Sequence, residues 1–154
     1  MPYLTGERSP INAPEAKSAF IGMTPDTTRE DMTSAVLEGV AFALRHNIDL
    51  IRASGIDVTR SKICGGGAAN KLWLKLIASA LDVELEVSPD EQGAALGAAL
   101  LAAAGDMSDG EWREFSSVFY KPGTVILPDT ELKAVLNEKY TLYRRISEKQ
   151  GEIL

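Results

Sequence analysis

Three consecutive glycines, Gly65, Gly66 and Gly67, constrain what this chain can fold into more than any other feature of its sequence. They follow an apolar segment, Val58–Cys64, whose pattern predicts a strand, and they precede a helical pattern that begins near Ala69. Glycines in this place remove every side chain at the carboxyl end of the strand, so a ligand can approach the backbone closely. The turn therefore predicts a ligand contact, or else a tight packing turn without a ligand.

The residues after the glycines favour a nucleotide as that ligand. Amide groups at the start of the next helix lie at its positive dipole end, where a phosphate binds readily. Asn70 adds a paired donor and acceptor that suits the edge of a purine base. The turn is not a P-loop, because Asn70-Lys71-Leu72 stands where Gly-Lys-Ser/Thr would close that motif, and it does not match G-x-G-x-x-G either.

The surrounding pattern predicts an α/β fold built on a βαβ unit over residues 58–87. Glu84–Val87 alternates in polarity, as a half-buried strand does. Upstream, a capping box at Thr27 and Glu30 opens a long amphipathic helix, and Gly55 ends it.

The two ends of the chain are expected to complete this fold. Residues 1–26 hold four prolines and predict an ordered loop with a short strand at Ser18–Met23. The helix Gly93–Ala104 is apolar almost all round, which predicts that it is sandwiched inside the protein. Residues 106–128 are expected to be irregular, and an amphipathic helix is expected over Glu131–Gln150.

Other chemistry-bearing residues favour structural interpretations. The lone Cys64 is expected to be a small core residue, and His46 is expected to be solvated on its helix. Asp90 and Glu91 are interpreted as acids of a helix's first turn, and Trp73 as part of the core rather than a stacking platform. No set of residues predicts a metal site or a nucleophilic triad.

Composition limits the classes of protein further. The chain has 154 residues, of which 45% are hydrophobic and 25% charged, and this suits one globular domain. A net charge of −6 disfavours a nucleic-acid surface. The longest apolar run, Ala94–Ala104, is shorter than the roughly 20 residues that a membrane span needs. One cysteine excludes an intrachain disulfide, so the expected compartment is the cytoplasm.

A longer motif occupies the first quarter of the chain. It reads small-x-apolar-x-Gly-apolar, then seven residues, then polar-apolar-x-x-small-apolar-apolar-acid. Its positions are filled by Ser18, Phe20, Gly22, Met23, Asp31, Met32, Ala35, Val36, Leu37 and Glu38. This motif resembles a signature of the FGGY carbohydrate kinases, the family of glycerol, gluconate and xylulose kinases. Pro2–Pro10, Glu38–Arg45, the glycine turn and Glu91–Ala99 also look like the xylulose kinase branch, so the resemblance covers nearly the whole chain.

The resemblance implies the fold. It predicts a C-terminal actin-like ATPase (ribonuclease H-like) domain that is incomplete, with its first strands missing from this chain. Residues 1–154 would be one fragment of that domain, with 1–26 as loop and short strand and 27–154 as the α/β core and C-terminal helix. The missing strands would leave an open sheet edge, which another chain or a second copy in a homodimer would cover.

The resemblance also assigns roles to the turn. Gly65, Gly66 and Asn70 would contact the adenosine part of ATP, and Gly67 and Ala68 would shape the turn. Xylulose kinases often have Arg-Ser or Lys-Ser after Gly-Gly-Gly-Ala, whereas this chain has Ala69-Asn70. Asn at this place resembles glycerol kinase.

The implied reaction is the phosphorylation of D-xylulose at its 5-hydroxyl by MgATP, with gluconate, ribulose or glycerol as alternative substrates. In the family, the catalytic aspartate, the sugar pocket and the turn for the terminal phosphates precede this segment. No catalytic residue is therefore expected here, Mg²⁺ would be held mainly by the missing part, and the chain alone would be inactive. The expected partners are ATP, a small sugar and the N-terminal kinase domain.

Two functions of other classes stay open at this point. The chain could be a non-catalytic actin-like nucleotide-binding module used in assembly or regulation. It could also be an α/β interaction domain in which the glycine turn is only a turn.

Overall fold

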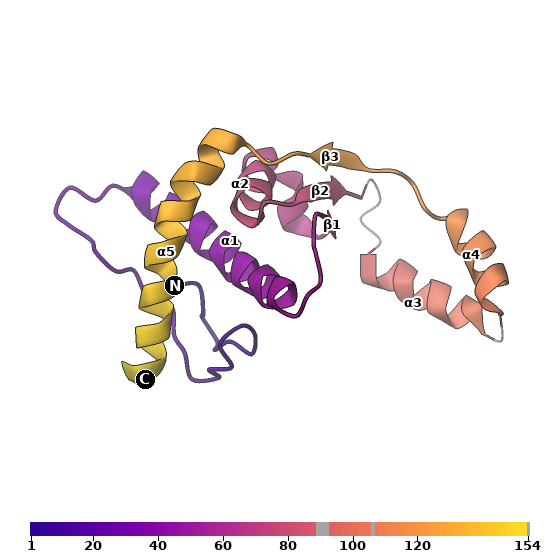
Figure 1. The fold of residues 1–154 in the computed structure, drawn as a ribbon, viewed down its shortest axis with the longest axis horizontal. Coiled ribbons are helices and arrows are strands. Elements are labelled where there is room, and N and C mark those ends of the chain that lie inside the picture. The colour runs from indigo at the N-terminus through magenta and orange to yellow at the C-terminus, as the bar shows by residue number, and fades with distance from the viewer. Residues whose placement is uncertain (89–92, 106, 154) are drawn as a thin grey trace.

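The computed structural model describes residues 1–88, 93–105 and 107–153 of the chain. The elements are helices, three short strands and one 3₁₀ turn, so the α/β prediction is confirmed (Figure 1). In chain order they are α1 (Arg29–Ala53), β1 (Arg60–Ile63), η1 (Gly66–Ala69), α2 (Lys71–Leu81), β2 (Glu84–Val87), α3 (Gly93–Ala104), α4 (Asp109–Ser117), β3 (Thr124–Ile126) and α5 (Thr130–Ile153).

The three strands form one sheet in the order β1-β2-β3. β1 and β2 are parallel, with Lys62 opposite Glu86, and α2 connects them, so the predicted βαβ unit is confirmed. β3 pairs antiparallel with β2, and Thr124 lies opposite Val87. Within the described residues β1 pairs only with β2, so its outer edge is open.

The core lies where α1, α2 and α5 meet one face of this sheet. Phe42 of α1 packs between two tyrosines of α5, with ring centroids 5.6 Å from Tyr140 and 5.4 Å from Tyr143. Leu136, Val83 and the inner face of α2, with Ile77 and Ala78, are almost fully buried beside them. Burying a side chain of this size contributes roughly 1.5–3 kcal/mol, so this cluster supplies most of the hydrophobic stabilisation.

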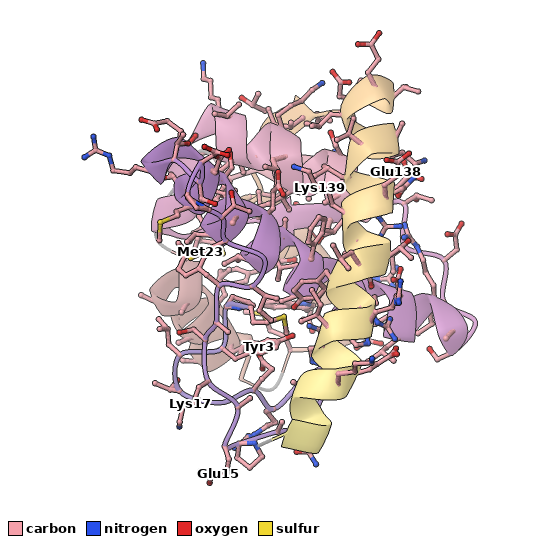
Figure 2. All side chains as sticks on the ribbon, turned by 90° about the vertical axis from the view of Figure 1, so that its left-hand side faces the viewer. Tyr3, Glu15, Lys17, Met23, Glu138 and Lys139 are labelled. Atoms are coloured by element: carbon pink, nitrogen blue, oxygen red, sulfur yellow. The ribbon has the colours of Figure 1, made fainter. Side chains whose placement is uncertain are left out.

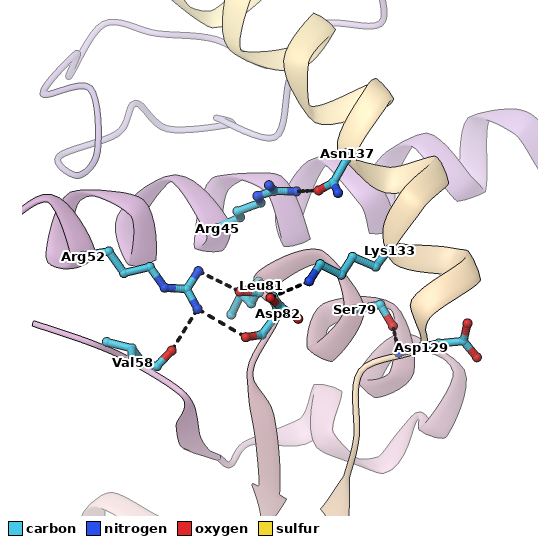
Figure 3. Close-up of polar contacts among 9 residues, drawn as sticks. All are labelled: Arg45, Arg52, Val58, Ser79, Leu81, Asp82, Asp129, Lys133 and Asn137. Atoms are coloured by element: carbon cyan, nitrogen blue, oxygen red, sulfur yellow. Dashed lines mark hydrogen bonds and ion pairs between the residues drawn. The ribbon is translucent and has the colours of Figure 1, made fainter.

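Arg52 joins the end of α1 to the segment before β1 and to the turn between α2 and β2 (Figure 3). Its guanidinium donates hydrogen bonds to the carbonyl oxygens of Leu81 at 3.0 Å, Val58 at 2.8 Å and Asp82 at 3.2 Å. Leu81 and Asp82 end α2, where free carbonyls and the negative dipole end favour a cation. This clamp fixes the segment that leads into β1 and so positions the glycine turn.

Polar contacts attach α5 to the same unit (Figure 3). The Ser79 hydroxyl accepts a hydrogen bond from the Asp129 amide at 2.9 Å, just before α5 begins. Lys133 of α5 forms an ion pair with Asp82, with Nζ 2.6 Å from Oδ2. Each exposed pair is weak, but together they set the direction in which α5 crosses the core.

The start of α1 differs from the prediction by one residue. Thr28, not Thr27, is the N-cap, and its hydroxyl accepts from the Asp31 amide while the Asp31 carboxylate accepts from the Thr28 amide. The Thr27 hydroxyl instead accepts from the Thr24 amide at 2.8 Å. The short Asp31 side chain reaches back to Thr28, so it replaces Glu30 in the box. Gly55 follows the helix with φ of +89°, as its predicted role as a stop requires.

The predicted strand at Ser18–Met23 is wrong. These residues are non-helical but have no ladder, apart from two backbone hydrogen bonds between Ala19 and Met1. A strand requires a partner along several residues, and the described chain supplies one residue.

The region after β2 also differs from the prediction. α3 is not sandwiched, since the Leu101 side chain is 72% exposed and α3 lies with α4 outside the core (Figure 1). The expected irregular stretch 106–128 contains α4, which a capping box at Ser108 and Glu111 opens, as well as β3. The start expected for α3 at Glu91 lies outside the described residues.

Two single-residue interpretations are also wrong. Cys64 is exposed rather than part of the core, because it follows β1 at the edge of the sheet. His46 is buried between α1 and α5, and burial, followed by the nearby Arg144 cation, lowers its pKa. Helical periodicity places a residue on a face, but it does not identify which neighbouring helix covers that face.

Candidate functional site

The glycine turn lies at the carboxyl edge of the parallel pair. β1 ends at Ile63 and β2 ends at Val87, and parallel strands place these ends on the same side of the sheet. β3 runs the opposite way, so the segment before Thr124 reaches the same edge. Ligands in open α/β sheets bind outside the carboxyl ends of the strands.

Gly65 and Gly66 expose bare backbone at this edge. Gly65 has φ of +94°, a conformation that side-chain-bearing residues rarely adopt, so glycine is required there. A Cβ added at Gly65 or Gly66 would meet no atom within 4 Å, and both residues are exposed. The protein's own side chains therefore leave this surface open to a ligand.

Gly67 and Ala68 shape the turn. A Cβ at Gly67 would lie 2.5 Å from the Trp73 ring, so only glycine allows the indole to pack beneath the turn. Trp73 is half-buried and packs against the core, which agrees with its predicted role. The Ala68 amide donates to the Gly65 carbonyl at 2.9 Å and closes the turn.

Asn70 is the N-cap of α2, rather than a residue one turn inside the helix. Its side-chain oxygen accepts a hydrogen bond from the Trp73 amide at 3.1 Å. This bond occupies the acceptor half of the expected donor–acceptor pair, and the exposed amide nitrogen remains as a donor. Asn70 therefore has a structural role in addition to the role in ligand binding that the sequence predicts.

A polar cluster at the same edge was not predicted. Glu86 is one of the polar residues in the alternating pattern of β2, but it is only 4% exposed. It accepts hydrogen bonds from the Gly123 amide at 3.0 Å and the Tyr120 hydroxyl at 2.8 Å, which lower its pKa, and it pairs with Arg60. The Lys62 ammonium lies 3.9 Å from the centroid of the Tyr120 ring. Two basic residues on β1 and two glutamates on β2 made an ion pair between these strands foreseeable. The contacts from residues 120–123 could not be foreseen from the sequence.

A large apolar cavity lies away from the glycine turn. It has a volume of about 560 Å³ and lies among the N-terminal loop, α1 and α5. All the residues of the sequence signature except Leu37 line it, and none of residues 64–70 does. This apolar cavity is therefore separate from the glycine turn.

The described residues contain neither a cluster of metal ligands nor a helix that could span a membrane. No three histidine, cysteine, aspartate or glutamate side chains lie together as a metal site in residues 1–88, 93–105 and 107–153. Over the same part of the chain, no helix is both long and apolar enough to cross a membrane.

Known proteins resemble this chain in sequence and in fold. Xylulose kinase from Staphylococcus xylosus is 32% identical over 146 residues, which cover 94% of this chain and 30% of the relative. The crystal structure of a xylulose kinase from Brucella ovis matches with a TM-score of 0.85 and 31% identity. The match covers 100% of this chain and 32% of that one. Gluconate kinase from Lactobacillus acidophilus matches with a TM-score of 0.85 and 25% identity, over 97% of this chain and 30% of that one.

The shares of length and the family match identify the part of the protein that this chain represents. The chain spans about 30% of the length of the curated relatives it matches. The solved relatives are a xylulose kinase and a gluconate kinase, and their match confirms the predicted actin-like ATPase fold. The family model for the C-terminal domain of the FGGY carbohydrate kinases matches residues 1–105, so this chain belongs to the FGGY family of carbohydrate kinases.

Proposed function

We propose that this chain forms the adenosine-binding part of a kinase in which MgATP phosphorylates D-xylulose at its 5-hydroxyl. The observation that supports this most directly is the open backbone at Gly65 and Gly66, at the carboxyl end of a parallel strand, in a chain of this kinase family. Because the chain spans about 30% of its relatives' length, the activity is proposed for the whole protein. The chain alone is expected to be inactive.

The residues of the turn fit ATP, which supplies the phosphoryl group. A surface without Cβ atoms lets a flat base and a ribose lie against Gly65 and Gly66. Gly67 and Ala68 keep the turn in shape, and the Asn70 side-chain nitrogen would donate to an acceptor on the purine. Because phosphoryl transfer depends on positioning, a rigid grip on adenosine sets where the terminal phosphate lies.

The remaining parts of the reaction are proposed to lie outside this chain. Mg²⁺ prefers several oxygen ligands, and we assign it mainly to the N-terminal part of the kinase. The base that takes the proton from the sugar hydroxyl is assigned there too. We also propose a cytoplasmic location, since a chain with one cysteine suits a reducing compartment.

We propose that residues 1–154 belong to one domain, with 1–26 as its ordered loop and 27–154 as its α/β core. Tyr3 of the loop is buried, and its hydroxyl lies 2.8 Å from that of Tyr143 in α5. The loop is therefore packed on the core rather than being a separate linker.

D-xylulose is the preferred substrate because the Staphylococcus xylosus relative and the Brucella ovis structure are both named as kinases of this sugar. Gluconate is the second candidate, because the Lactobacillus acidophilus gluconate kinase has the same TM-score at a lower identity. Glycerol is a further candidate, because the glycerol kinase of Pediococcus pentosaceus is 33% identical over 146 residues. Ribulose stays an alternative substrate.

A sugar panel tests the substrate. The intact kinase that contains this chain is assayed with ATP and D-xylulose, gluconate, ribulose or glycerol, and kcat/KM is compared. The proposal expects the highest value for D-xylulose. A preference for gluconate of tenfold or more, equal to about 1.4 kcal/mol in transition-state binding, would replace xylulose by the second candidate.

Nucleotide titration tests the class of function. The isolated chain is expected to bind ATP weakly, and Asn70→Ala or Gly66→Leu should weaken it further. Gly110→Leu in α4 is the matched control, since a Cβ there also meets no atom within 4 Å. Identical binding by all these variants would favour a domain in which the turn is only a turn.

A further inference from the structure

Glu86 is a buried carboxylate on the face of the sheet that points away from the core. Exposure alternates along β1, where Arg60 and Lys62 are exposed and Ile63 packs against the core. Lys62 lies opposite Glu86 in the parallel register, and residues paired in this way point to the same face. A carboxylate that is 4% exposed costs free energy unless hydrogen bonds compensate for the lost water. Glu86 therefore depends on partners on this outer face.

Two partners of Glu86 come from the segment 118–123, which joins α4 to β3 (Figure 1). The Tyr120 hydroxyl and the Gly123 amide donate hydrogen bonds to one carboxylate oxygen of Glu86, at 2.8 and 3.0 Å. Arg60 donates to the other oxygen at 2.9 Å. The bonds from Gly123 and Tyr120 lower the pKa of Glu86, and the bond to Glu86 raises the pKa of Tyr120. The tyrosine thus keeps its proton and the glutamate its charge at neutral pH, which fixes the direction of the bond.

Gly123 brings the same segment against the end of β2. A Cβ added at Gly123 would lie 1.9 Å from the carbonyl oxygen of Val87, so only glycine permits this approach of the two backbones. Val87 is the last residue of β2. The segment 118–123 is therefore held against the carboxyl edge of the sheet, which is also the edge that carries the glycine turn.

Tyr120 connects β2 with β1 at this edge. Its hydroxyl is bonded to Glu86 of β2, and its ring faces the Lys62 ammonium of β1, with Nζ 3.9 Å from the ring centroid. A cation this close to the face of an aromatic ring is attracted by the ring's electrons. Lys62 precedes Gly65 by three residues, which span at most about 10 Å of extended chain. The ring therefore holds β1 just before the glycine turn begins.

The glycine turn is supported from two sides. The Ala68 amide, which donates to the Gly65 carbonyl, and the Trp73 ring support it from the side of α2. Gly65 and Gly66 have no side chains to pack, and glycine loses more conformational freedom on ordering than any other residue. Among the described residues β1 pairs only with β2, so the support on the strand side depends on how the end of β1 is held.

We propose that Tyr120 is a positioning residue for nucleotide binding. Held by Glu86, it fixes Lys62 and the end of β1, so that the backbone of Gly65 and Gly66 is already oriented for adenosine before ATP binds. This role depends on the nucleotide function proposed above for the turn. Tyr120 need not touch ATP, because a loop that is fixed in advance loses less freedom when its ligand binds.

The same contacts could serve the stability of the sheet alone. Tyr120 is 48% exposed, so it contributes little to the hydrophobic core. A residue that only stabilises the fold changes Tm and leaves the KM of the folded enzyme as it was. A residue that positions the turn changes the KM for ATP, and it leaves kcat unchanged when ground-state and transition-state binding weaken equally. Kinetics therefore separates the two roles.

Removal of one hydroxyl is the first test. In the intact kinase that contains this chain, Tyr120→Phe keeps the ring and loses the bond to Glu86. It should raise the KM for ATP about threefold or more and leave kcat and the KM for the sugar within about twofold. Tyr140→Phe is the matched control, because its hydroxyl also donates to a carboxylate, that of Asp49 at 2.6 Å, but between α5 and α1. Tyr140→Phe should lower Tm and leave the KM for ATP unchanged.

Exchange of the cation is the second test. Lys62→Met should raise the KM for ATP by a similar factor, and Lys62→Arg should restore it to within about twofold of the parent, since a guanidinium also stacks on an aromatic ring. Lys139→Met is the control at another exposed lysine, which lies on α5 with Nζ 2.6 Å from a carboxylate oxygen of Glu38 (Figure 2). It should leave the KM for ATP unchanged. Lys62 is exposed, so its variants are expected to fold.

Gly66→Leu in the same kinase separates failure of the positioning role from failure of the nucleotide assignment. If Gly66→Leu raises the KM for ATP about tenfold or more while Tyr120→Phe and Lys62→Met leave it unchanged, the positioning role is overturned and the nucleotide site stands. If Gly66→Leu itself leaves this KM unchanged, the nucleotide function of the turn fails, and the positioning role fails with it. An equal rise for Tyr140→Phe and Tyr120→Phe would also overturn the positioning role, since the effect would then be general destabilisation.

NMR of this chain on its own reports on the turn directly. The amide signals of Gly65 and Gly66 should shift in Tyr120→Phe and stay in place in Tyr140→Phe. Unshifted signals of both glycines in a folded Tyr120→Phe chain would show that the tyrosine does not orient the turn. That result would overturn the proposal even if the intact variant is unstable.

Discussion

α2 and α3 are apolar helices of nearly the same length, and each follows a strand of the parallel pair, yet their surroundings differ. Leu74 of α2 is 2% exposed, and α1, α5 and the sheet cover the helix. Leu101 of α3 is 72% exposed, and α3 lies outside the core with α4 (Figure 1). Apolar composition thus predicts burial only where the same chain supplies the cover.

The exposed surface of α3 and the open edge of β1 are what is expected of a chain that corresponds to only part of its relatives. A helix with no polar face is stable in water only when something packs against it. Because this chain spans about 30% of the curated relatives, the rest of such a kinase is available as cover. The α2 half is therefore expected to unfold as a cooperative unit, whereas the α3–α4 arm (93–117) is expected to contribute little to its stability.

The largest expected effect comes from truncating the same residue type in the two helices. Leu74→Ala should lower the free energy of unfolding by about 3 kcal/mol, because it opens a cavity in the core. Leu101→Ala should change it by less than about 0.5 kcal/mol, as exposed substitutions usually do. Urea unfolding of both variants measures the difference. Similar losses would show that α3 is part of the cooperative core.

The next effect is expected at the Arg52 clamp. Arg52→Ala removes three hydrogen bonds to the carbonyls of Leu81, Val58 and Asp82 and should cost about 2 kcal/mol. Arg113→Ala in α4 is the control in the arm and should leave the urea midpoint unchanged. A loss at Arg113 as large as that at Arg52 would break the distinction between the two regions.

A smaller effect is expected at the helix caps. Asn70→Ala removes the cap of α2 and should cost about 1 kcal/mol of global stability. Ser108→Ala removes the corresponding residue of α4 and should leave the global midpoint unchanged, because α4 frays separately. Thermal unfolding of the two variants compares them. An Asn70→Ala variant as stable as the parent would mean that α2 does not depend on this cap.

The smallest effect is expected from pH. The Gly123 amide and the Tyr120 hydroxyl lower the pKa of Glu86 below the usual glutamate value of 4.5. A lowered pKa stabilises the folded state above the unfolded pKa, and this stabilisation is lost as pH falls through the folded pKa. Tm should therefore fall as pH drops below 4.5, and Glu86→Gln should flatten this part of the profile.

Glu111 is the matched carboxylate in the arm. Hydrogen bonds from Ser108 lower its pKa as well. Glu111→Gln should nevertheless leave the pH profile of Tm unchanged, because the arm unfolds independently of the core. A profile that responds to Glu111→Gln and not to Glu86→Gln would reverse the comparison.

The parts of the fold that could be predicted depend on local pattern. The βαβ unit, the bounds of β2 and the stop at Gly55 follow from periodicity and turn residues, which act over a few positions. The burial of Glu86 and the exposure of α3 depend on segments far away in the sequence or outside the chain. The helix α4 was missed although Ser108 and Glu111 match a capping box, because its apolar stripe is short.

The position of the glycine turn in the fold was predicted, although not every detail of its packing. Three glycines after a strand located the carboxyl edge correctly. The packing of Trp73 under Gly67 and the capping bond of Asn70 could not be inferred, since both depend on the direction in which α2 leaves the turn. Tyr120 reaches the same edge only because β3 pairs with β2.

The claim on which the proposed function depends is that the backbone at Gly65 and Gly66 contacts the adenosine of ATP. We define a chimaera as the Staphylococcus xylosus kinase in which this chain replaces the matching section. The most direct measurement is the KM for ATP of this chimaera and of its Gly66→Leu variant, with Gly110→Leu as control. Gly66→Leu should raise the KM for ATP at least tenfold, or about 1.4 kcal/mol, and leave the KM for D-xylulose within twofold. An unchanged KM for ATP in an active, folded Gly66→Leu chimaera would contradict the claim.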